Sequence, residues 1–229
     1  HGHHRRQRQM CIRDRYRTGD RLMLIVLPKG RLLKEIKNLL ELIGISFEDS
    51  SRKLVIDTSV KDIKVAILRS WDIPKFVNKG IADMGFVGKD VLNEIEDEEN
   101  FYESLDMGLG KCRLSLASFK QETDSNKPIV ATKYPVSAKA FFASKMQNVE
   151  IIKLKGAIEI APILGLSDYI VDLVQTGNTL KDNGLSELEV IQDISTRLII
   201  NKSSFKTNNQ KIEKLIISMK NALNENFKN

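Results

Sequence analysis

The chain has 229 residues, of which 36 are basic and 30 acidic, so its formal net charge is +6. Residues 1–22 hold seven arginines against two aspartates, which leaves the rest of the chain nearly neutral and without the basic excess typical of nucleic-acid-binding proteins. All three histidines also lie there, and the rest of the chain has one cysteine, Cys112. These counts exclude a Ser-His or Cys-His catalytic pair, a Cys/His zinc site and an internal disulfide from the body of the protein.

Residues 1–22 are predicted to be a non-native or disordered leader that takes no part in the fold. The segment is dense in arginine and lacks the apolar stretch of a secretory signal. We expect the folded body to begin near Met23. No stretch of that body reaches the roughly 18 consecutive apolar residues of a membrane-spanning helix, so we expect a cytoplasmic protein with no membrane partner.

In the first half of the body, short apolar runs alternate with amphipathic segments, which predicts an α/β fold. Gly44 and Gly80 are expected to end the first two helices, and the acidic run Glu94–Glu99 is expected to be solvated surface. Strands are predicted over residues 22–27, 53–57, 65–68 and 81–87, with helices starting near residues 31, 73 and 89.

A polar loop over residues 121–127, after a strand predicted over 113–119, marks the change to a second half with the same alternation. A β-rich segment over residues 189–200 is expected to return the chain to the first half, where a closing helix docks its apolar face on a sheet. Strands are predicted over residues 129–131, 149–154 and 169–174, with helices starting near residues 135, 156 and 176. The domain prediction is residues 23–112 with 196–229 for domain I, and residues 113–195 for domain II.

The strongest candidate for a ligand site is the loop Thr176–Thr179, which joins a buried strand to a helix. Backbone N–H groups at a helix start lack intrahelical partners and carry partial positive charge, so they suit a phosphate. Gly177 allows close approach, the two threonine hydroxyls are further donors, and Asp172 is placed to hold ribose hydroxyls. The alternative is that Thr176 or Asn178 merely caps a helix, a far commoner arrangement.

Pro28–Arg31 repeats this order of strand, glycine and helix start in the first half. Lys29 and Arg31 oppose the helix dipole there, which is a poor placement unless an anion lies between them and the backbone amides. The alternative is a pair of surface cations on a solvated turn.

Three further signals are weaker. Asp83 and Gly85 lie where a strand leads through glycine into a helix, and the alternative is that Gly88 and Asp90 of this segment are packing and capping residues. Glu159 lies in a predicted first helical turn, where a dipole-stabilised surface glutamate is an equal alternative. Arg52 follows two serines and is by itself most simply an exposed residue at a strand start.

Seven segments of the body, taken in order, resemble the ATP phosphoribosyltransferase family. They are Leu27–Leu32, Ser51–Leu54, Asp72–Pro74, Asp83–Asp90, Ala131–Pro135, Gly156–Pro162 and Asp172–Leu180. The similarity covers essentially all of residues 23–229, and the ordered set is far more specific than any one motif. One departure is Gln175, where the family usually has an acidic residue.

The resemblance implies two α/β domains around a central cleft, similar to type II periplasmic binding proteins. It also implies an enzyme that moves the phosphoribosyl group of phosphoribosyl pyrophosphate (PRPP) to N1 of ATP, with Mg²⁺ as cofactor, in the first step of histidine biosynthesis. The composition suits this chemistry, because N1 of adenine already has a lone pair and needs no histidine base. Arginines and a metal ion would ease the departure of pyrophosphate.

The resemblance also implies roles for individual residues. PRPP would be bound by Asp172, Thr176, Gly177, Asn178, Thr179 and Glu159. ATP would be bound by Lys29, Gly30, Asp83 and Gly85. The catalytic residues facing the pyrophosphate would be Arg31 and Arg52. Mg²⁺ would be held mainly through PRPP, so no metal-ligating residue is assigned.

The chain is similar to the short form of the family, which lacks a C-terminal regulatory domain. That form implies a dimer of this chain within a hetero-octamer, built with a regulatory subunit that resembles histidyl-tRNA synthetase. Nucleic acid is not an expected partner. The alternatives are a non-catalytic module of the same two-domain shape that binds a small anion, and a phosphoribosyltransferase with a different nucleophile.

Overall fold

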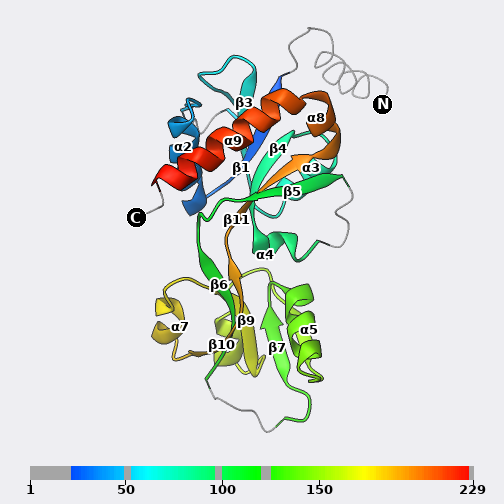
Figure 1. Ribbon diagram of the computed structural model, residues 1–229. Helices are drawn as coiled ribbons and strands as arrows, with labels where there is room; N and C mark the ends of the chain where they lie inside the picture. Colours follow the sequence, from blue (N-terminus) through cyan, green and yellow to red (C-terminus); the bar gives the residue numbers. More distant parts are fainter. Residues whose placement is uncertain (1–21, 49–52, 96–99, 120–124, 227–229) are drawn as a thin grey trace, which may run out of the picture. The chain divides into compact units, whose positions relative to one another are not determined.

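The computed structural model describes residues 22–48, 53–95, 100–119 and 125–226, which form two compact α/β units (Figure 1). The first unit comprises the described parts of residues 1–87, 99–107 and 198–229, and the second comprises those of 88–98 and 108–197. The predicted leader up to residue 21 and the predicted site residue Arg52 lie outside the described residues. None of the helices in the described ranges is long and apolar enough to cross a membrane.

The first unit is built on a six-stranded sheet with the order β2-β3-β1-β4-β11-β5. Its strands are β1 (Met23–Pro28), β2 (Val55–Asp57), β3 (Ile63–Leu68), β4 (Met84–Gly88), β5 (Phe101–Asp106) and β11 (Thr196–Asn201). β1 runs parallel to both β3 and β4, so the carboxyl ends of these three strands meet at one edge of the sheet. All six residues of β1 are buried, as expected for a central parallel strand.

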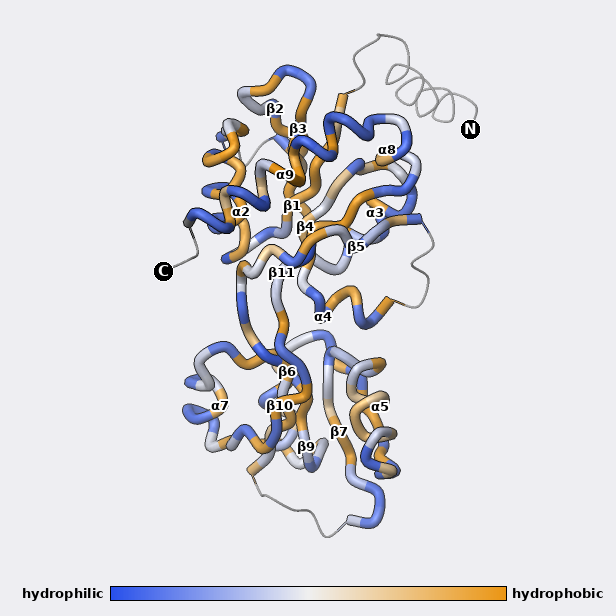
Figure 2. Tube along the Cα trace, viewed as in Figure 1, coloured by the Kyte–Doolittle hydropathy of each residue, from blue (hydrophilic) through white to orange (hydrophobic). Residues whose placement is uncertain are grey.

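Four helices cover this sheet: α2 (Arg31–Leu42), α3 (Ile73–Asn78), α8 (Lys202–Thr207) and α9 (Asn209–Asn226). Ile36, Leu39 and Leu40 of α2 are buried, and α2 contacts the closing helix α9, whose Ile212 and Met219 are fully buried. Figure 2 shows hydrophobic residues concentrated along β1, β3 and β4, and both polar and hydrophobic residues along α9. Gly44 follows α2 with a φ of 83°, which confirms the predicted helix end.

The second unit is built on a five-stranded sheet with the order β10-β6-β9-β7-β8. Its strands are β6 (Cys112–Ser118), β7 (Ile129–Thr132), β8 (Glu150–Lys153), β9 (Tyr169–Val174) and β10 (Ser186–Ile194), and its helices are α4 (Lys89–Leu92), α5 (Pro135–Ser144), α6 (Ile160–Ile163) and α7 (Asn178–Asp182). β7, β8 and β9 run parallel, whereas β6 is antiparallel to both β9 and β10. The buried core beside α6 and α7 includes Ile158, Ile170 and Leu180.

The predicted domain boundary differs from the observed one. Residues 88–98 and 108–112 belong to the second unit, so the chain changes unit four times rather than twice. The reason is local bonding: Glu94 is hydrogen-bonded to the start of α5, and Leu109 accepts a hydrogen bond from Thr196 within the second unit. Glu94 was therefore wrongly predicted to be solvated surface, because it has a structural role, whereas residues 96–99 of the acidic run lie outside the described residues.

Two predicted elements also differ in extent. β5 was not predicted, because its sequence shows no regular alternation of apolar residues. The helix expected near residue 156 begins only at Ile160, since Ala157 adopts a φ of 52° that a helix cannot include.

Candidate active site

The loop Thr176–Thr179 lies where β9 ends and α7 begins, as predicted. Gly177 is the N-cap of α7 with a φ of 80°, a left-handed conformation that glycine adopts without strain. The N-cap is a glycine and so has no side chain to bond the first turn of α7, and Thr176, Asn178 and Thr179 are exposed. One long hydrogen bond of the capping type runs from the Asn178 N–H to the Thr176 hydroxyl at 3.4 Å, so Thr176 caps the helix weakly. The loop therefore presents the first turn of α7 to solvent.

The start of α5 is different, because a carboxylate already occupies it. Glu94 accepts hydrogen bonds from the backbone N–H groups of Val136 and Ser137, both at 2.9 Å, and from the Ser137 hydroxyl at 2.7 Å. An internal anion thus satisfies the donors that α5 would otherwise offer to a ligand. Of these two helix starts in the second unit, only that of α7 is left for an external anion.

Asp172 lies on β9 near this loop and is half-buried. Its Oδ1 atom accepts a hydrogen bond from the Leu173 N–H at 2.8 Å. Burial, together with the negative charges of Glu159 and Asp90, raises the pKa of Asp172 to about 6, although the Leu173 N–H and the Lys133 ammonium act to lower it. The negative charge of Glu159 therefore acts on Asp172, and the ribose-binding role of the two residues stays a prediction.

A buried Asp90–Tyr134 pair lies beside Asp172 and was not among the predicted site residues. The Tyr134 hydroxyl donates a hydrogen bond to the Asp90 carboxylate, and both residues are less than 10% exposed. Burial raises the pKa of Asp90 and, with the charge of Asp90, that of Tyr134. Gly88 is required here, since a Cβ at that position would lie 2.1 Å from the Asp90 Oδ1 atom. The signal was present in the sequence, because Gly88–Asp90 and Thr132–Pro135 both follow predicted strands.

In the first unit, Lys29, Gly30 and Arg31 lie at the carboxyl end of β1, the edge where ligands bind in α/β sheets. All three residues are exposed. Gly30 is the N-cap of α2 with a φ of 104°, and the Lys29 N–H donates to the Leu68 carbonyl at 2.7 Å. Two cations therefore stand at the exposed start of a helix, as predicted.

Asp83 and Gly85 are placed differently from the prediction, since both have structural roles. Asp83 is 2% exposed at the amino end of β4, and its two carboxylate oxygens accept hydrogen bonds from the Leu24 N–H at 2.8 Å and the Ser204 hydroxyl at 2.6 Å. A Cβ on Gly85 would lie 2.7 Å from Ile73 and 2.9 Å from Val26, so glycine is needed for α3 to pack on the sheet. Burial and these contacts leave neither residue exposed to a nucleotide, which corrects the ATP-binding prediction for both.

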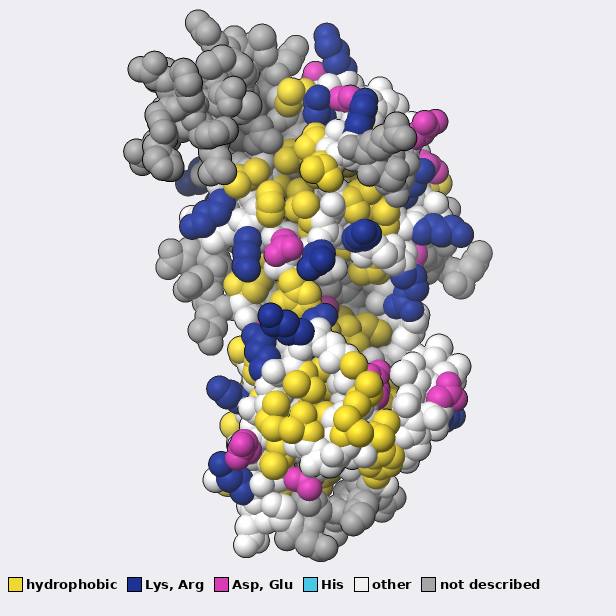
Figure 3. All heavy atoms as spheres, turned by 180° about the vertical axis from the view of Figure 1, so that it is seen from behind, with side chains coloured by type: hydrophobic (Ala, Val, Ile, Leu, Met, Phe, Trp, Pro, Cys, Tyr) yellow, Lys and Arg dark blue, Asp and Glu magenta, His cyan; other side chains and the backbone are white. Residues whose placement is uncertain are grey.

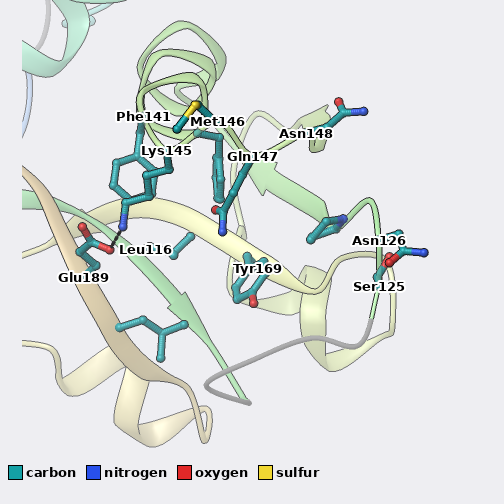
Figure 4. Close-up of a pocket in the computed structure, with 13 residues that line it drawn as sticks. Leu116, Ser125, Asn126, Phe141, Lys145, Met146, Gln147, Asn148, Tyr169 and Glu189 are labelled. Atoms are coloured by element: carbon teal, nitrogen blue, oxygen red, sulfur yellow. Dashed lines mark hydrogen bonds and ion pairs between the residues drawn. The ribbon is translucent and has the colours of Figure 1, made fainter.

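A pocket of about 720 Å³ in the second unit lies away from the predicted site (Figure 4). Its lining includes Pro128, Asn148 and Tyr169, which precede or begin β7, β8 and β9. These are the amino ends of the parallel strands, whereas the loop Thr176–Thr179 follows the carboxyl end of β9. Lys145 and Glu189 form an ion pair at one side of this pocket.

Comparison with known proteins supports the predicted resemblance. The family model described as HisG, ATP phosphoribosyltransferase, matches residues 69–221. The chain is similar to an ATP phosphoribosyltransferase from Vesicomyosocius okutanii subsp. Calyptogena okutanii, with 48% identity over 206 residues that cover 88% of this chain and 100% of the relative.

Solved structures show the same fold. The ATP phosphoribosyl transferase (HisG:HisZ) complex from Thermotoga maritima contains a chain that matches with a TM-score of 0.78 at 33% identity, over 90% of this chain and 100% of that one. The periplasmic VFT2 domain of BvgS from Bordetella pertussis matches with a TM-score of 0.54 at 11% identity, over 96% of this chain and 92% of the domain. At that identity the second match shows the fold alone.

Proposed function

This chain belongs to the ATP phosphoribosyltransferase family, and we propose that it uses the loop Thr176–Thr179 to hold the 5-phosphate of PRPP. The family's reaction transfers the phosphoribosyl group to N1 of ATP, releases pyrophosphate and begins histidine biosynthesis. The observation that carries the proposal is the exposed start of α7, where the Thr176 hydroxyl is a weak acceptor, 3.4 Å from the Asn178 N–H. The corresponding backbone donors of α5 are already bonded to Glu94. Asp172 and Glu159 are the proposed contacts for the ribose.

The chemistry demands little proton transfer and much stabilisation of negative charge. The bond from C1 of the ribose to the pyrophosphate oxygen breaks, and the lone pair on N1 of adenine forms the new bond to C1. Negative charge develops on the departing pyrophosphate, so cationic donors held in place lower the barrier. We assign this role to Arg31 and to Arg52, which lies outside the described residues. Lys29 and Gly30 are the proposed contacts for the ATP phosphates.

Mg²⁺ is proposed to enter with PRPP. Bound to the diphosphate, the ion would neutralise charge on the leaving group. A nearby cation would stabilise ionised Asp172, because the negative charge of Glu159 disfavours that ionised form in the free protein. Within the described ranges, however, no group of three or more His, Cys, Asp or Glu residues is placed to hold a metal ion. The diphosphate is therefore the proposed main source of ligands.

The proposal extends to a partner and a location. A regulatory subunit similar to histidyl-tRNA synthetase is proposed, supported by the likeness to a chain of the T. maritima HisG:HisZ complex. Exposed apolar side chains on the second unit, including Ile163, Leu164 and Leu166, offer a surface for protein contact, and Figure 3 shows hydrophobic side chains gathered on this unit. A dimer of this chain within a hetero-octamer is the proposed assembly. ATP as a substrate supports a cytoplasmic location.

Steady-state kinetics with each substrate varied in turn test the residue roles. Thr179→Ala should raise the KM for PRPP about tenfold and leave the KM for ATP within twofold, because it removes a donor to the phosphate. Arg31→Ala should lower kcat by about 10²-fold, because that donor acts on charge that develops in the transition state. Thr207→Ala and Lys34→Ala, on exposed helix surfaces of the first unit, are the matched controls. An unchanged KM for PRPP in Thr179→Ala would contradict the assignment of the loop.

A further inference from the structure

Arg113 on β6 is hydrogen-bonded to the residue just before the loop Thr176–Thr179, hereafter the phosphate loop. β6 and β9 are antiparallel, and Arg113 lies opposite Val174, the last residue of β9. This register puts the guanidinium within reach of the next residue, and its Nη1 atom donates a hydrogen bond to the Gln175 carbonyl oxygen at 3.2 Å. A charged side chain thus holds the backbone one residue before Thr176.

The guanidinium is itself fixed by a second strand. Its Nε and Nη2 atoms donate to the two carboxylate oxygens of Glu187 on β10, each at 2.5 Å, and the Ser115 hydroxyl donates to the same carboxylate at 2.7 Å. The side chains of Arg113 and Glu187 are 31% and 24% exposed. A bidentate pair of this kind fixes the plane of the guanidinium as well as its position. Nη1 therefore has a defined direction toward Gln175.

The Gln175 carbonyl sets the direction of the first amide of the loop. The peptide unit is planar and trans, so the Gln175 C=O and the Thr176 N–H point in opposite directions. When Arg113 holds the oxygen on one side, the Thr176 N–H is held on the other. Gly177 then turns the chain through its left-handed conformation into α7. Without this bond, the peptide unit between Gln175 and Thr176 would be freer to rotate.

We propose that Arg113, held by Glu187, is a positioning residue that orients the phosphate loop through the Gln175 carbonyl. The inference rests on the proposed function of Thr176–Thr179 as the binding loop for the 5-phosphate. Arg113 acts on the backbone and makes no contact with substrate. Lysine cannot replace Arg113, because a single ammonium group cannot donate to both Glu187 carboxylate oxygens and to the Gln175 carbonyl with the fixed geometry of a planar guanidinium.

The test compares Arg113→Lys with Lys145→Met. Lys145 also pairs with a glutamate on β10, Glu189, but at the pocket near the amino ends of the parallel strands. Ribose 5-phosphate is the probe in calorimetric titration, because it carries the 5-phosphate without the pyrophosphate. Arg113→Lys should raise its Kd, and the KM for PRPP, about tenfold, with the KM for ATP within twofold. Lys145→Met should leave all three values within twofold.

Thermal unfolding and Thr179→Ala keep the outcomes distinct. If Arg113→Lys lowers the melting temperature and alters both KM values alike, Arg113 is only structural and the inference is wrong. If Thr179→Ala weakens ribose 5-phosphate but Arg113→Lys does not, the loop binds phosphate without needing Arg113, and the inference alone is overturned. If Thr179→Ala has no effect on ribose 5-phosphate, the proposed function of the loop fails, whatever Arg113→Lys shows.

Discussion

Asp172 shows how burial and neighbouring charges prepare one side chain for a ligand. Its carboxylate is half-buried, and Glu159 and Asp90 add negative charge around it. Ionised Asp172 is therefore costly in the free protein, since neither water nor a full set of cations compensates the charge. Ribose hydroxyls, which donate hydrogen bonds, would relieve that cost when PRPP binds.

The raised pKa of Asp172 predicts a pH-dependent cost to folding. The pKa rises from 3.8 to about 6, so the folded protein binds this proton more tightly than the unfolded chain does. The penalty is absent below pH 3.8, grows between pH 4 and 6, and is complete above pH 6. Asp172→Asn lacks the penalty and should melt about 4 °C above the wild type at pH 7. At pH 4 the two melting temperatures should nearly coincide.

Asp182→Asn, on the exposed surface of α7, is the control for this experiment. The test is whether the difference from the wild type varies more with pH in Asp172→Asn than in Asp182→Asn. If the difference in melting temperature between Asp172→Asn and the wild type is the same at pH 4 and pH 7, the pKa of Asp172 is not raised. Ionised Asp172 then does not destabilise the free protein.

Among the elements, α5 shows what can be predicted from a sequence and what cannot. Tyr134-Pro135 predicts its start correctly, because proline suits a first helical turn. The residue that satisfies its free donors, Glu94, lies over forty positions earlier, in a run of acidic residues with no sign of a buried partner. Contacts between distant segments of this kind leave no periodic pattern, so they appear only in the folded structure.

Removal of the Glu94 carboxylate should destabilise the second unit. Glu94→Ala leaves the first N–H groups of α5 without their charged acceptor, a loss of about 2 kcal/mol. The melting temperature should fall by about 5 °C. Glu150→Ala is the control, because it removes a carboxylate from an exposed ion pair with Lys127 in the same unit. It should change the melting temperature by less than about 2 °C. Equal effects of the two variants would show that Glu94 is an ordinary surface residue.

Among the site residues too, those marked by a local sequence pattern were predicted, whereas those that depend on contacts between distant segments were not. The glycine turns after β1 and β9 were predicted correctly, because the strand–glycine–helix pattern is local in the sequence. Asp83 was misassigned, since a carboxylate beside a strand looks the same in a sequence whether it meets a ligand or, as here, a buried serine. Arg113 was missed because its role depends on the pairing of β6 with β9 and β10.

The chain as a whole combines two sheet-based units, and the chain changes unit four times. The domain prediction placed two changes, one at residue 113, before the strand that leads to the polar loop, and one at residue 196, in the β-rich return. The composition of the short segment 88–98 does not indicate a change of domain. It is nevertheless important for the candidate site, since it supplies both Asp90 and Glu94 to the second unit.

Feedback control is expected to need the partner. Inhibition by histidine requires a second pocket whose occupancy changes the affinity or rate at the first. We place that pocket with the synthetase-like subunit, given the likeness to a chain of the T. maritima complex. Light scattering should show a larger assembly when the two proteins are mixed, and histidine should then inhibit without competing with PRPP. Potent non-competitive inhibition of the isolated chain would contradict this expectation.

The most direct measurement is ultraviolet detection of phosphoribosyl-ATP when the purified chain is given ATP, PRPP and Mg²⁺. The absorbance of the modified adenine should rise only when both substrates are present, and should not rise with other purine bases in place of ATP. Thr179→Ala should reach a similar rate only at about tenfold higher PRPP. No product with ATP, or equal product with another base as the acceptor, would show that the chain does not catalyse the reaction of its family.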